Sequence, residues 1–284
     1  MKKYILQSLV FLLILPIALI AQNKDNELKK QLGNNPSVGK YIKTRGINLY
    51  YEVYGEGEPL LLIHGNGGTM NNFRYQIDFF AKKYKVIGVD SRAQGKSVDT
   101  SSVLNYEMMA DDFNALLDTL KIDSVNVIGW SDGGINALLL AIRHPQKVKK
   151  IAITGANLVP DTSVFSTYNN NMNATDLARL RALKQDEKTK NSIKLIHMME
   201  IEPNIPLTDL HKIKCPVLVI GGDNDLIKVS HTLQIFENIP QAYLWIVPFA
   251  GHATVQRHKE EFNKTVFEFF NTPFHFVPGD DWDK

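Results

Sequence analysis

The stretch Gly129-Trp130-Ser131-Asp132-Gly133-Gly134 lies between a strand-like run, Val125–Ile128, and a helical pattern that extends from Asp132 to Arg143. A serine between a buried strand and a helix sits on a sharp turn, and small neighbours let the backbone take the strained conformation that exposes its hydroxyl. The helix N-terminus also directs N–H groups towards negative charge that develops on an attacked carbonyl. Ser131 is therefore the candidate nucleophile.

Strand-like runs and amphipathic helical patterns alternate on both sides of this turn. Eight runs have the strand pattern: Lys40–Arg45, Ile47–Tyr54, Leu60–Ile63, Val86–Val89, Val125–Ile128, Ile151–Ile153, Val217–Ile220 and Tyr243–Val247. The first two are predicted to form an antiparallel hairpin, whereas apolar strands separated by helices indicate a parallel sheet buried on both faces. The predicted fold class is α/β, with a mostly parallel eight-stranded sheet and helices on both faces.

One stretch interrupts the alternation. Between Gly155 and Lys214 there are only helical patterns, and a gap of about 60 residues in a compact domain favours a functional insertion over a structureless loop. We predict a helical cap there. The predicted organisation is a signal peptide (1–21), a linker (22–39), the first part of the core (40–156), the helical cap (157–212), the second part of the core (213–272) and a C-terminal tail (273–284).

A nucleophilic serine needs a base, and the base needs an orienting carboxylate. Both follow predicted strands, Asp225 after the run that ends at Ile220 and His252 after the run that ends at Val247. The carboxyl ends of parallel strands form the edge where ligands bind in open α/β sheets. We assign Asp225 as the acid and His252 as the base, in the chain order Ser, Asp, His. Asp223 is the rival acid.

A glycine-rich loop, His64-Gly65-Asn66-Gly67-Gly68, directly follows the run Leu60–Ile63. Glycines let the backbone approach the nucleophile closely, so the N–H of Asn66 is predicted to pair with that of Asp132 as an oxyanion hole. His64 is expected to support the loop by hydrogen bonds rather than to act as a base.

Four motifs follow one another along the chain: His64-Gly65-Asn66-Gly67, Asp90-Ser91-Arg92-Ala93-Gln94-Gly95-Lys96-Ser97, the Ser131 turn, and Asp225 with His252. Together they resemble the α/β-hydrolase superfamily, from about Lys40 to the end of the last helix. The Ser131 turn, Gly155-Ala156-Asn157 and Cys215-Pro216 are similar to the valacyclovir hydrolase-like (biphenyl hydrolase-like) serine esterases. The resemblance implies hydrolysis of esters or related small acyl compounds with no metal or organic cofactor. Ala93 departs from the family, which usually has glycine there.

The substrate-binding candidates are Asp132 and Trp130, on either side of the nucleophile. The resemblance implies amino acid esters as substrates, and a carboxylate at Asp132 that faces the pocket would pair with a substrate amine. The alternative is an aspartate favoured by the helix dipole and satisfied locally.

Ser131, Asp225 and His252 are also compatible with other functions. An iminopeptidase-type peptidase and a carbon–carbon bond hydrolase use the same chemistry, and pocket shape under the cap decides between them. A receptor-like protein that holds a ligand with slow turnover is a further alternative. Haloalkane dehalogenases and epoxide hydrolases are disfavoured, because their nucleophile is aspartate where this chain has Ser131.

Composition and the N-terminus indicate the compartment and exclude some partners. A net charge of +2 over 284 residues gives no basic excess for nucleic acid binding. Lys2 and Lys3, followed by the apolar run from Leu9 to Ala21 and polar residues, are typical of a secretory signal peptide cleaved after Ala21. We expect a periplasmic or secreted protein with no membrane association after cleavage; because Leu19 stands where a small residue is usual, an uncleaved N-terminal anchor is the alternative.

The single cysteine, Cys215, allows no intramolecular disulfide. It stands at the start of a buried-strand pattern and is expected to be a small core residue. No metal-ligand spacing is present, so no metal is predicted. The oligomeric state is left open.

Overall fold

The computed structural model describes residues 31–166 and 170–277. The predicted signal peptide, residues 1–21, lies outside the described residues, so export remains a prediction. Residues 22–30 of the predicted linker and residues 278–284 of the predicted tail also lie outside the described residues.

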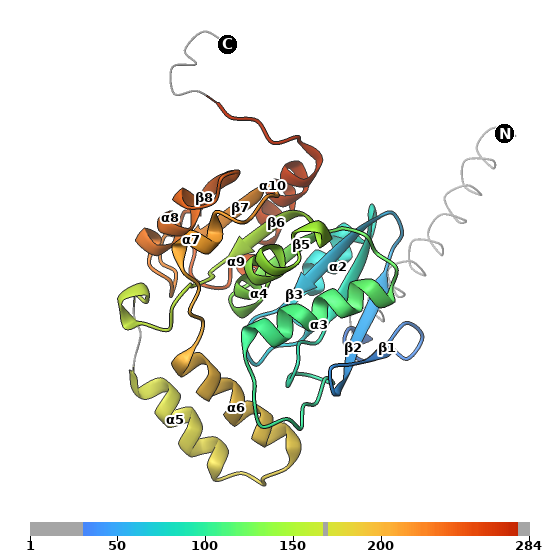
Figure 1. Ribbon diagram of the computed structural model, residues 1–284, viewed down its shortest axis with the longest axis vertical. Coiled ribbons are helices and arrows are strands. Elements are labelled where there is room, and N and C mark those ends of the chain that lie inside the picture. The colour runs from blue at the N-terminus through green and yellow to red at the C-terminus, as the bar shows by residue number, and fades with distance from the viewer. Residues whose placement is uncertain (1–30, 167–169, 278–284) are drawn as a thin grey trace, which may run out of the picture.

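An eight-stranded sheet forms the centre of the molecule (Figure 1). Its strands are β1 (Lys40–Thr44), β2 (Ile47–Tyr54), β3 (Glu58–Ile63), β4 (Tyr84–Val89), β5 (Val125–Trp130), β6 (Val148–Thr154), β7 (Val217–Gly222) and β8 (Ala242–Val247). The spatial order is β1-β2-β4-β3-β5-β6-β7-β8. β1 pairs with β2, and β2 with β4, in the antiparallel sense, and every other pair is parallel. The predicted fold class and mostly parallel sheet are confirmed.

Helices cover both faces of the sheet. They are η1 (Met70–Phe73), α2 (Arg74–Phe80), α3 (Tyr106–Thr119), α4 (Asp132–Arg143), η2 (Pro145–Lys147), α8 (Val229–Glu237), α9 (Thr254–Arg257) and α10 (Lys259–Asn271). Side chains of α3, α4 and α8 belong to one apolar cluster, and those of α2, α9 and α10 to a second.

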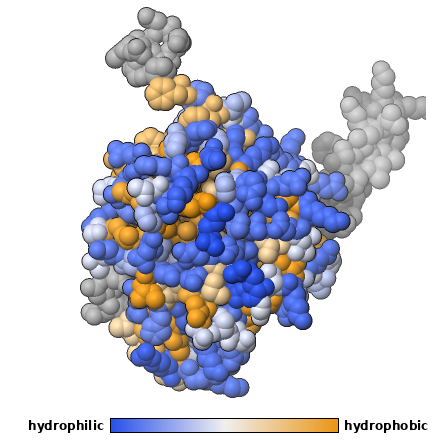
Figure 2. All heavy atoms as spheres, viewed as in Figure 1, coloured by the Kyte–Doolittle hydropathy of each residue, from blue (hydrophilic) through white to orange (hydrophobic). Residues whose placement is uncertain are grey.

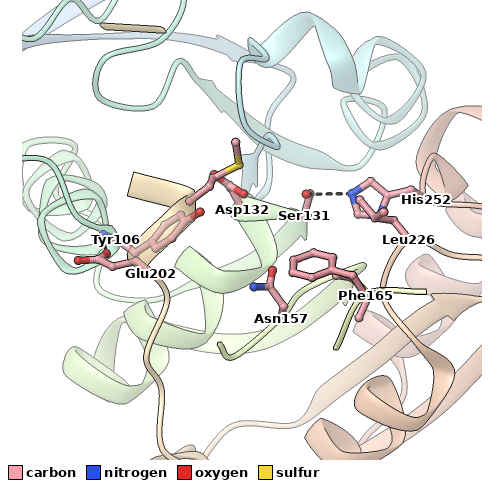
Figure 3. A pocket seen from close by; sticks show the side chains of 10 residues that line it. Tyr106, Ser131, Asp132, Asn157, Phe165, Glu202, Leu226 and His252 are labelled. Carbon is pink, nitrogen blue, oxygen red and sulfur yellow. Dashed lines mark hydrogen bonds between the residues drawn. The ribbon is translucent and has the colours of Figure 1, made fainter. Parts of the chain in front are cut away.

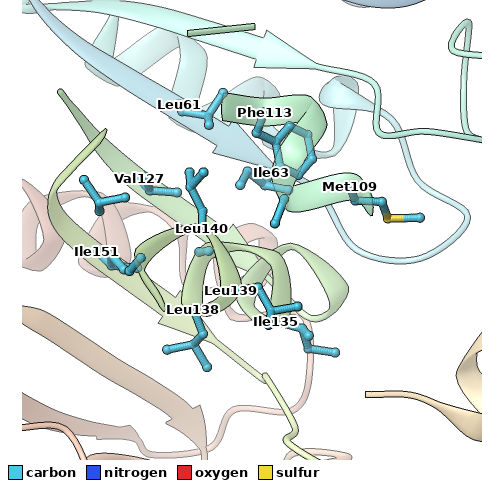
Figure 4. Packing of buried hydrophobic residues seen from close by; sticks show 14 of the residues in the cluster. Leu61, Ile63, Met109, Phe113, Val127, Ile135, Leu138, Leu139, Leu140 and Ile151 are labelled. Carbon is cyan, nitrogen blue, oxygen red and sulfur yellow. The ribbon is translucent and has the colours of Figure 1, made fainter. Parts of the chain in front are cut away.

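Strand β3 shows why both faces must be covered. Leu61 and Ile63 pack in the first cluster, where they meet Phe113 and Leu140 (Figure 4), whereas the alternate residues Leu60 and Leu62 pack in the second. Successive side chains of a strand point to opposite faces. A run that is apolar at every position therefore places one hydrophobic layer on each side of the sheet.

Four helical segments lie between β6 and β7, in the region predicted to be a cap. They are η3 (Thr162–Val164), α5 (Asn170–Arg181), α6 (Glu187–Ile201) and α7 (Leu207–Leu210), and no described residue of this insertion belongs to a sheet strand. α5 and α6 form a hairpin at one end of the molecule (Figure 1). Lys194 Nζ of α6 lies 2.8 Å from Asp99 Oδ2, which joins this hairpin to the segment after β4.

Residues 31–39, the second part of the predicted linker, are folded against β2. Leu32 is buried, and the N–H groups of Gly33 and Asn35 each donate to the carboxylate of Glu52 at 2.9 Å. Glu52 also accepts from the hydroxyls of Tyr50 and Tyr54. A buried carboxylate needs such donors, and this requirement fixes the segment to the sheet.

Cys215 is buried in the first apolar cluster, as expected. Burial raises the pKa of its thiol to about 12, so the thiol is protonated and unreactive at neutral pH.

None of the helices in the described part of the chain is long and apolar enough to cross a membrane. The face drawn in Figure 2 is mostly hydrophilic, with hydrophobic residues scattered among the polar ones.

Candidate active site

Ser131 occupies a strained turn between β5 and α4. Its φ is 56°, a left-handed conformation that is costly for a residue with a Cβ, and its N–H donates to Thr154 O at 2.8 Å. A Cβ added to Gly133 would lie 1.8 Å from Ile63 O, and one added to Gly129 would lie 2.3 Å from Gly133 O. The two glycines are therefore required for the close packing that holds Ser131 at the sheet edge.

The predicted base and acid lie beside this serine. His252 Nε2 is 2.9 Å from Ser131 Oγ, and His252 Nδ1 is 2.7 Å from Asp225 Oδ1 (Figure 3). The three side chains follow β5, β7 and β8, so the parallel register brings them to one edge. The structure thus joins Ser131, His252 and Asp225 in one line of hydrogen bonds.

The two candidate acids have different surroundings. Asp225 is 3% exposed, and its carboxylate also accepts from the N–H groups of Ile227 and Gly222, at 3.1 and 3.3 Å. The exposed Asp223 accepts from the N–H groups of Phe249 and Ala250, and these bonds lower the pKa of its carboxyl group. Asp225 is therefore the carboxylate that contacts His252, and Asp223 shapes the loop before it.

The loop after β3 lies against the nucleophile. A Cβ added to Gly65 would lie 3.0 Å from Ser131 Cβ, and Asn66 Nδ2 donates to Asp132 Oδ2 at 2.9 Å. His64 supports this loop from beneath, because its Nδ1 contacts Gly65 O and its Nε2 accepts from the N–H of Ser91. Burial lowers the pKa of His64, which favours the neutral ring that this hydrogen bond requires.

A cavity of about 90 Å³ opens beside Ser131 and His252 (Figure 3). Its lining residues are Tyr106, Ser131, Asp132, Asn157, Phe165, Met199, Glu202, Leu226, Ile227 and His252. This described lining includes two carboxylates, Asp132 and Glu202, and no lysine or arginine.

Burial raises the pKa of both carboxyl groups in the lining. For Asp132, the hydrogen bond from Asn66 and the nearby Tyr106 and His252 side chains oppose the effect of burial. For Glu202, the N–H of Tyr106 opposes it. A cationic group that entered the cavity would favour the ionised form of each.

Trp130 does not line the cavity, although it was predicted to bind substrate. Its Nε1–H donates to the carbonyl of His252 at 2.8 Å. Side chains alternate along β5, so Trp130 shares the face of Ile128, where both pack with the second apolar cluster. Trp130 therefore supports the histidine loop.

Tyr106, Glu202 and Phe165 are site residues that the sequence patterns did not single out. Tyr106 is the first residue of α3, and its neighbour Asn105 caps that helix by accepting from Met108 N–H. The Asn cap marks the helix start, which was the available signal for Tyr106. Glu202 follows α6 and Phe165 follows η3, and no spacing relates them to Ser131.

Two further expectations concern metal binding and Ala93. No group of three or more His, Cys, Asp or Glu side chains within residues 31–166 and 170–277 has the arrangement of a metal site. Ala93 has a φ of 65°, the left-handed region that favours glycine. Its N–H donates to Ser97 O at 2.8 Å, so the turn keeps this conformation although it has a Cβ.

A mostly parallel sheet with a strained serine turn between strand and helix, and a histidine and an aspartate after later strands, defines the α/β-hydrolase class. The chain belongs to this family: residues 58–199 match the family described as alpha/beta hydrolase fold. It is similar to the serine hydrolase BPHL of Mus musculus, with 28% identity over 247 residues, 80% of this chain and 84% of the relative.

Two further relatives differ in the reactions that their names state. A putative carbamate hydrolase, RutD, from a Caulobacter species is 27% identical over 256 residues, which covers 78% of this chain and 96% of the relative. The solved structure of a mutant meta-cleavage product hydrolase from Pseudomonas fluorescens, in complex with acetates, superposes with a TM-score of 0.67 at 25% identity, and the match covers 84% of this chain and 99% of that one. The chain is thus a hydrolase of the α/β fold whose relatives act on several substrate types.

Proposed function

We propose that this protein is a serine hydrolase that cleaves carboxylic esters through an acyl-enzyme intermediate. The observation that carries the proposal is the line of hydrogen bonds from Ser131 Oγ to His252 Nε2 and from His252 Nδ1 to Asp225 Oδ1. A serine hydroxyl is a weak nucleophile until a base removes its proton. A buried carboxylate on the other ring nitrogen holds the imidazole in the tautomer that this step requires.

The reaction follows from this arrangement. Ser131 Oγ attacks the ester carbonyl while His252 takes its proton, and the N–H groups of Asn66 and Asp132 hold the oxyanion. The C–O bond then breaks, and His252 gives the proton to the departing alcohol. A water molecule that His252 activates releases the acid from Ser131 by the reverse steps.

Substitution of the nucleophile tests the proposal. Ser131→Ala is expected to lower kcat for p-nitrophenyl acetate and butyrate by about three orders of magnitude or more. The matched control is Ser124→Ala, one residue before β5 and so at the opposite end of that strand, which is expected to leave kcat unchanged. Ester turnover that survives in a folded Ser131→Ala protein contradicts the proposal.

The cavity wall supports a finer proposal, that the preferred esters carry a cationic amine. Asp132 and Glu202 supply negative charge with no lysine or arginine in the described lining. The Asp132 carboxylate already accepts from Asn66 Nδ2, but a carboxylate has about four acceptor sites, so an ammonium group finds free lone pairs.

The ratio of kcat/KM values for an ester with an amine and one without it tests whether Asp132 binds the amine. For a valine ester and the matching 3-methylbutanoate ester, Asp132→Asn is expected to lower the ratio of kcat/KM values about tenfold or more. The ratio separates recognition of the amine from any effect of Asp132 on the chemistry, because that effect acts on both esters. An unchanged ratio contradicts amine binding by Asp132.

The same assays distinguish the alternatives. Faster turnover of a prolyl anilide identifies an iminopeptidase-type peptidase, and faster turnover of a vinylogous diketone identifies a carbon–carbon bond hydrolase. Covalent labelling of Ser131 by a fluorophosphonate, without turnover of any substrate, identifies a receptor-like protein.

We also propose that the protein is exported to the periplasm or secreted. The proposal rests on Lys2 and Lys3 and on the apolar run from Leu9 to Ala21. A mature protein whose N-terminal residue is Gln22 supports it, and an intact N-terminus in a membrane fraction indicates an anchor instead.

A further inference from the structure

Lys194, on helix α6, joins the insertion to the core through three hydrogen bonds. Its Nζ donates to Asp99 Oδ2 at 2.8 Å, to Asp99 O at 3.0 Å and to Ser101 O at 2.9 Å. An ammonium group has three N–H donors, so one short segment after β4 satisfies all of them. The side chain of Lys194 therefore attaches α6 to the core at a defined point.

The carboxylate that receives Lys194 is itself held inside the core. Asp99 is 1% exposed, and its Oδ1 accepts from Arg92 Nη1 at 3.0 Å. Arg92 is equally buried and donates to both carboxylate oxygens of Asp112 on α3, at 2.6 and 2.8 Å. Because paired and buried charged groups have few alternative positions, Asp99 is a fixed point against which α6 is placed.

The contact between α6 and the loop after β4 is otherwise packed incompletely. A cavity of about 60 Å³ lies between them, and its lining includes Asn191 of α6 and Gln94 of the loop. The buried oxygens Asn191 Oδ1 and Gln94 Oε1 have no hydrogen-bond partner within residues 31–166 and 170–277. Polar groups without partners add no attraction across this contact, so the bonds of Lys194 supply the directional attachment.

The same helix forms part of the wall of the active-site cavity. Met199 of α6 and Glu202, directly after it, line this cavity. Glu202 Oε2 accepts from the N–H of Tyr106 at 3.1 Å, and both residues lie on the side of the cavity away from His252 (Figure 3). Lys194 precedes Glu202 by eight residues, about 12 Å along a helix. The helix is thus attached at its end and near its middle, with Met199 between the two points.

We propose that Lys194 is a positioning residue for substrate selection, whose bonds to Asp99 set the place of α6 and, through it, the place of Met199 in the cavity wall. The proposal rests on the proposed ester hydrolysis. The cavity beside Ser131 measures about 90 Å³, so a small displacement of one wall changes which acyl groups it accepts.

Loss of the ammonium group is expected to release α6 without undocking it. Leu195 and Met198 are buried in the first apolar cluster and keep the helix on the core. The attachment at Glu202 also remains. The helix is then free to turn about that end, which moves Met199 and widens the cavity, whereas the catalytic side chains stay in place because they follow strands of the core.

Lys194→Met tests the proposal, because methionine keeps the apolar part of the side chain and removes the charge and the donors. The ratio of kcat/KM for p-nitrophenyl octanoate to that for p-nitrophenyl acetate is expected to rise about fivefold or more, since the wider cavity accepts the longer chain. For the acetate, kcat is expected to change by less than about twofold. An unchanged ratio in the folded variant overturns the proposal.

Lys147→Met is the matched control. The Lys147 side chain is 14% exposed, against 23% for Lys194, and its Nζ contacts Asp118 Oδ1 at 2.6 Å and Ile122 O at 2.9 Å. It too joins two elements, but both belong to the core. This variant is expected to lose stability with the octanoate-to-acetate ratio unchanged. A rise in Lys147→Met equal to that in Lys194→Met would mean that general loosening of the fold explains both, and would overturn the proposal.

Hydrogen–deuterium exchange tests the position of α6 without any substrate. In Lys194→Met the amides of residues 191–201 are expected to exchange about fivefold faster or more, with those of β5 unchanged. Unchanged exchange in α6 overturns the proposal. If Ser131→Ala retains ester turnover, the proposed function fails instead, and the exchange measurement still shows whether Lys194 holds the helix.

Discussion

Asn66 Nδ2 donates a hydrogen bond of 2.9 Å to Asp132 Oδ2, which ties the loop after β3 to the first residue of α4. The bond joins the two residues whose N–H groups are proposed to form the oxyanion hole. The carboxylate between them is buried, and its ionisation is therefore linked to the stability of the fold.

Asp132→Asn should change the pH dependence of stability. Burial raises the pKa of Asp132 in the folded protein above its value in the unfolded chain. The stability that this group contributes is then present below the unfolded pKa of about 4 and is lost as the pH rises through the folded pKa. Asparagine does not titrate, so the stability of the variant relative to wild type should increase from pH 4 to pH 7.5. Urea denaturation at the two pH values measures the difference, and a decrease over this range contradicts the assignment.

Substitutions at the two neighbouring aspartates should have unequal effects. Asp225→Asn removes the carboxylate that accepts from His252 and should lower kcat for p-nitrophenyl acetate by roughly three to four orders of magnitude. Asp223→Asn keeps one of the two oxygens that accept from the N–H groups of Phe249 and Ala250, and Asp223 does not contact His252, so kcat should fall less than about tenfold. Steady-state kinetics of the two variants decide the matter, and a reversed order would assign the acid to Asp223.

Alanine substitutions at two glycines should distinguish the free-energy cost of lost close packing from that of backbone strain. In Gly133→Ala the new Cβ would meet the carbonyl oxygen of Ile63, so we expect destabilisation of more than about 3 kcal/mol. Gly46 has a φ of +85° and open space around it, and Gly46→Ala should cost only about 1–2 kcal/mol. Equal free energies of unfolding in urea would show that the turn at Gly133 is not tightly packed.

The strands could be predicted because burial on both faces leaves an unbroken apolar run. Such runs located β3, β4 and β7, and the glycine-rich turn located the start of α4 at Asp132. The lengths of the cap helices were less predictable: the first turn of α6 (Glu187–Ile201) is polar and exposed and therefore carries no apolar periodicity. The order of the strands depends on pairing between distant segments, which periodicity does not record.

The site was predictable where each residue follows a strand. Ser131, Asp225 and His252 all come after runs that end at the same sheet edge, so their meeting follows from the parallel topology. The cavity wall was not predictable in the same way, because Glu202 and Phe165 reach it through the packing of the insertion on the core. Trp130 was assigned from its position next to the serine, although the structure directs its side chain towards the carbonyl of His252.

Covalent labelling shows whether Ser131 is the nucleophile. After reaction with a fluorophosphonate, mass spectrometry of the digested protein should find one adduct, on the peptide that contains Ser131, and ester turnover should fall in proportion to labelling. Prior removal of the base in His252→Ala should slow the labelling strongly. A fully labelled Ser131 in a protein that still hydrolyses esters, or inactivation with the adduct on another residue, would show that Ser131 is not the nucleophile.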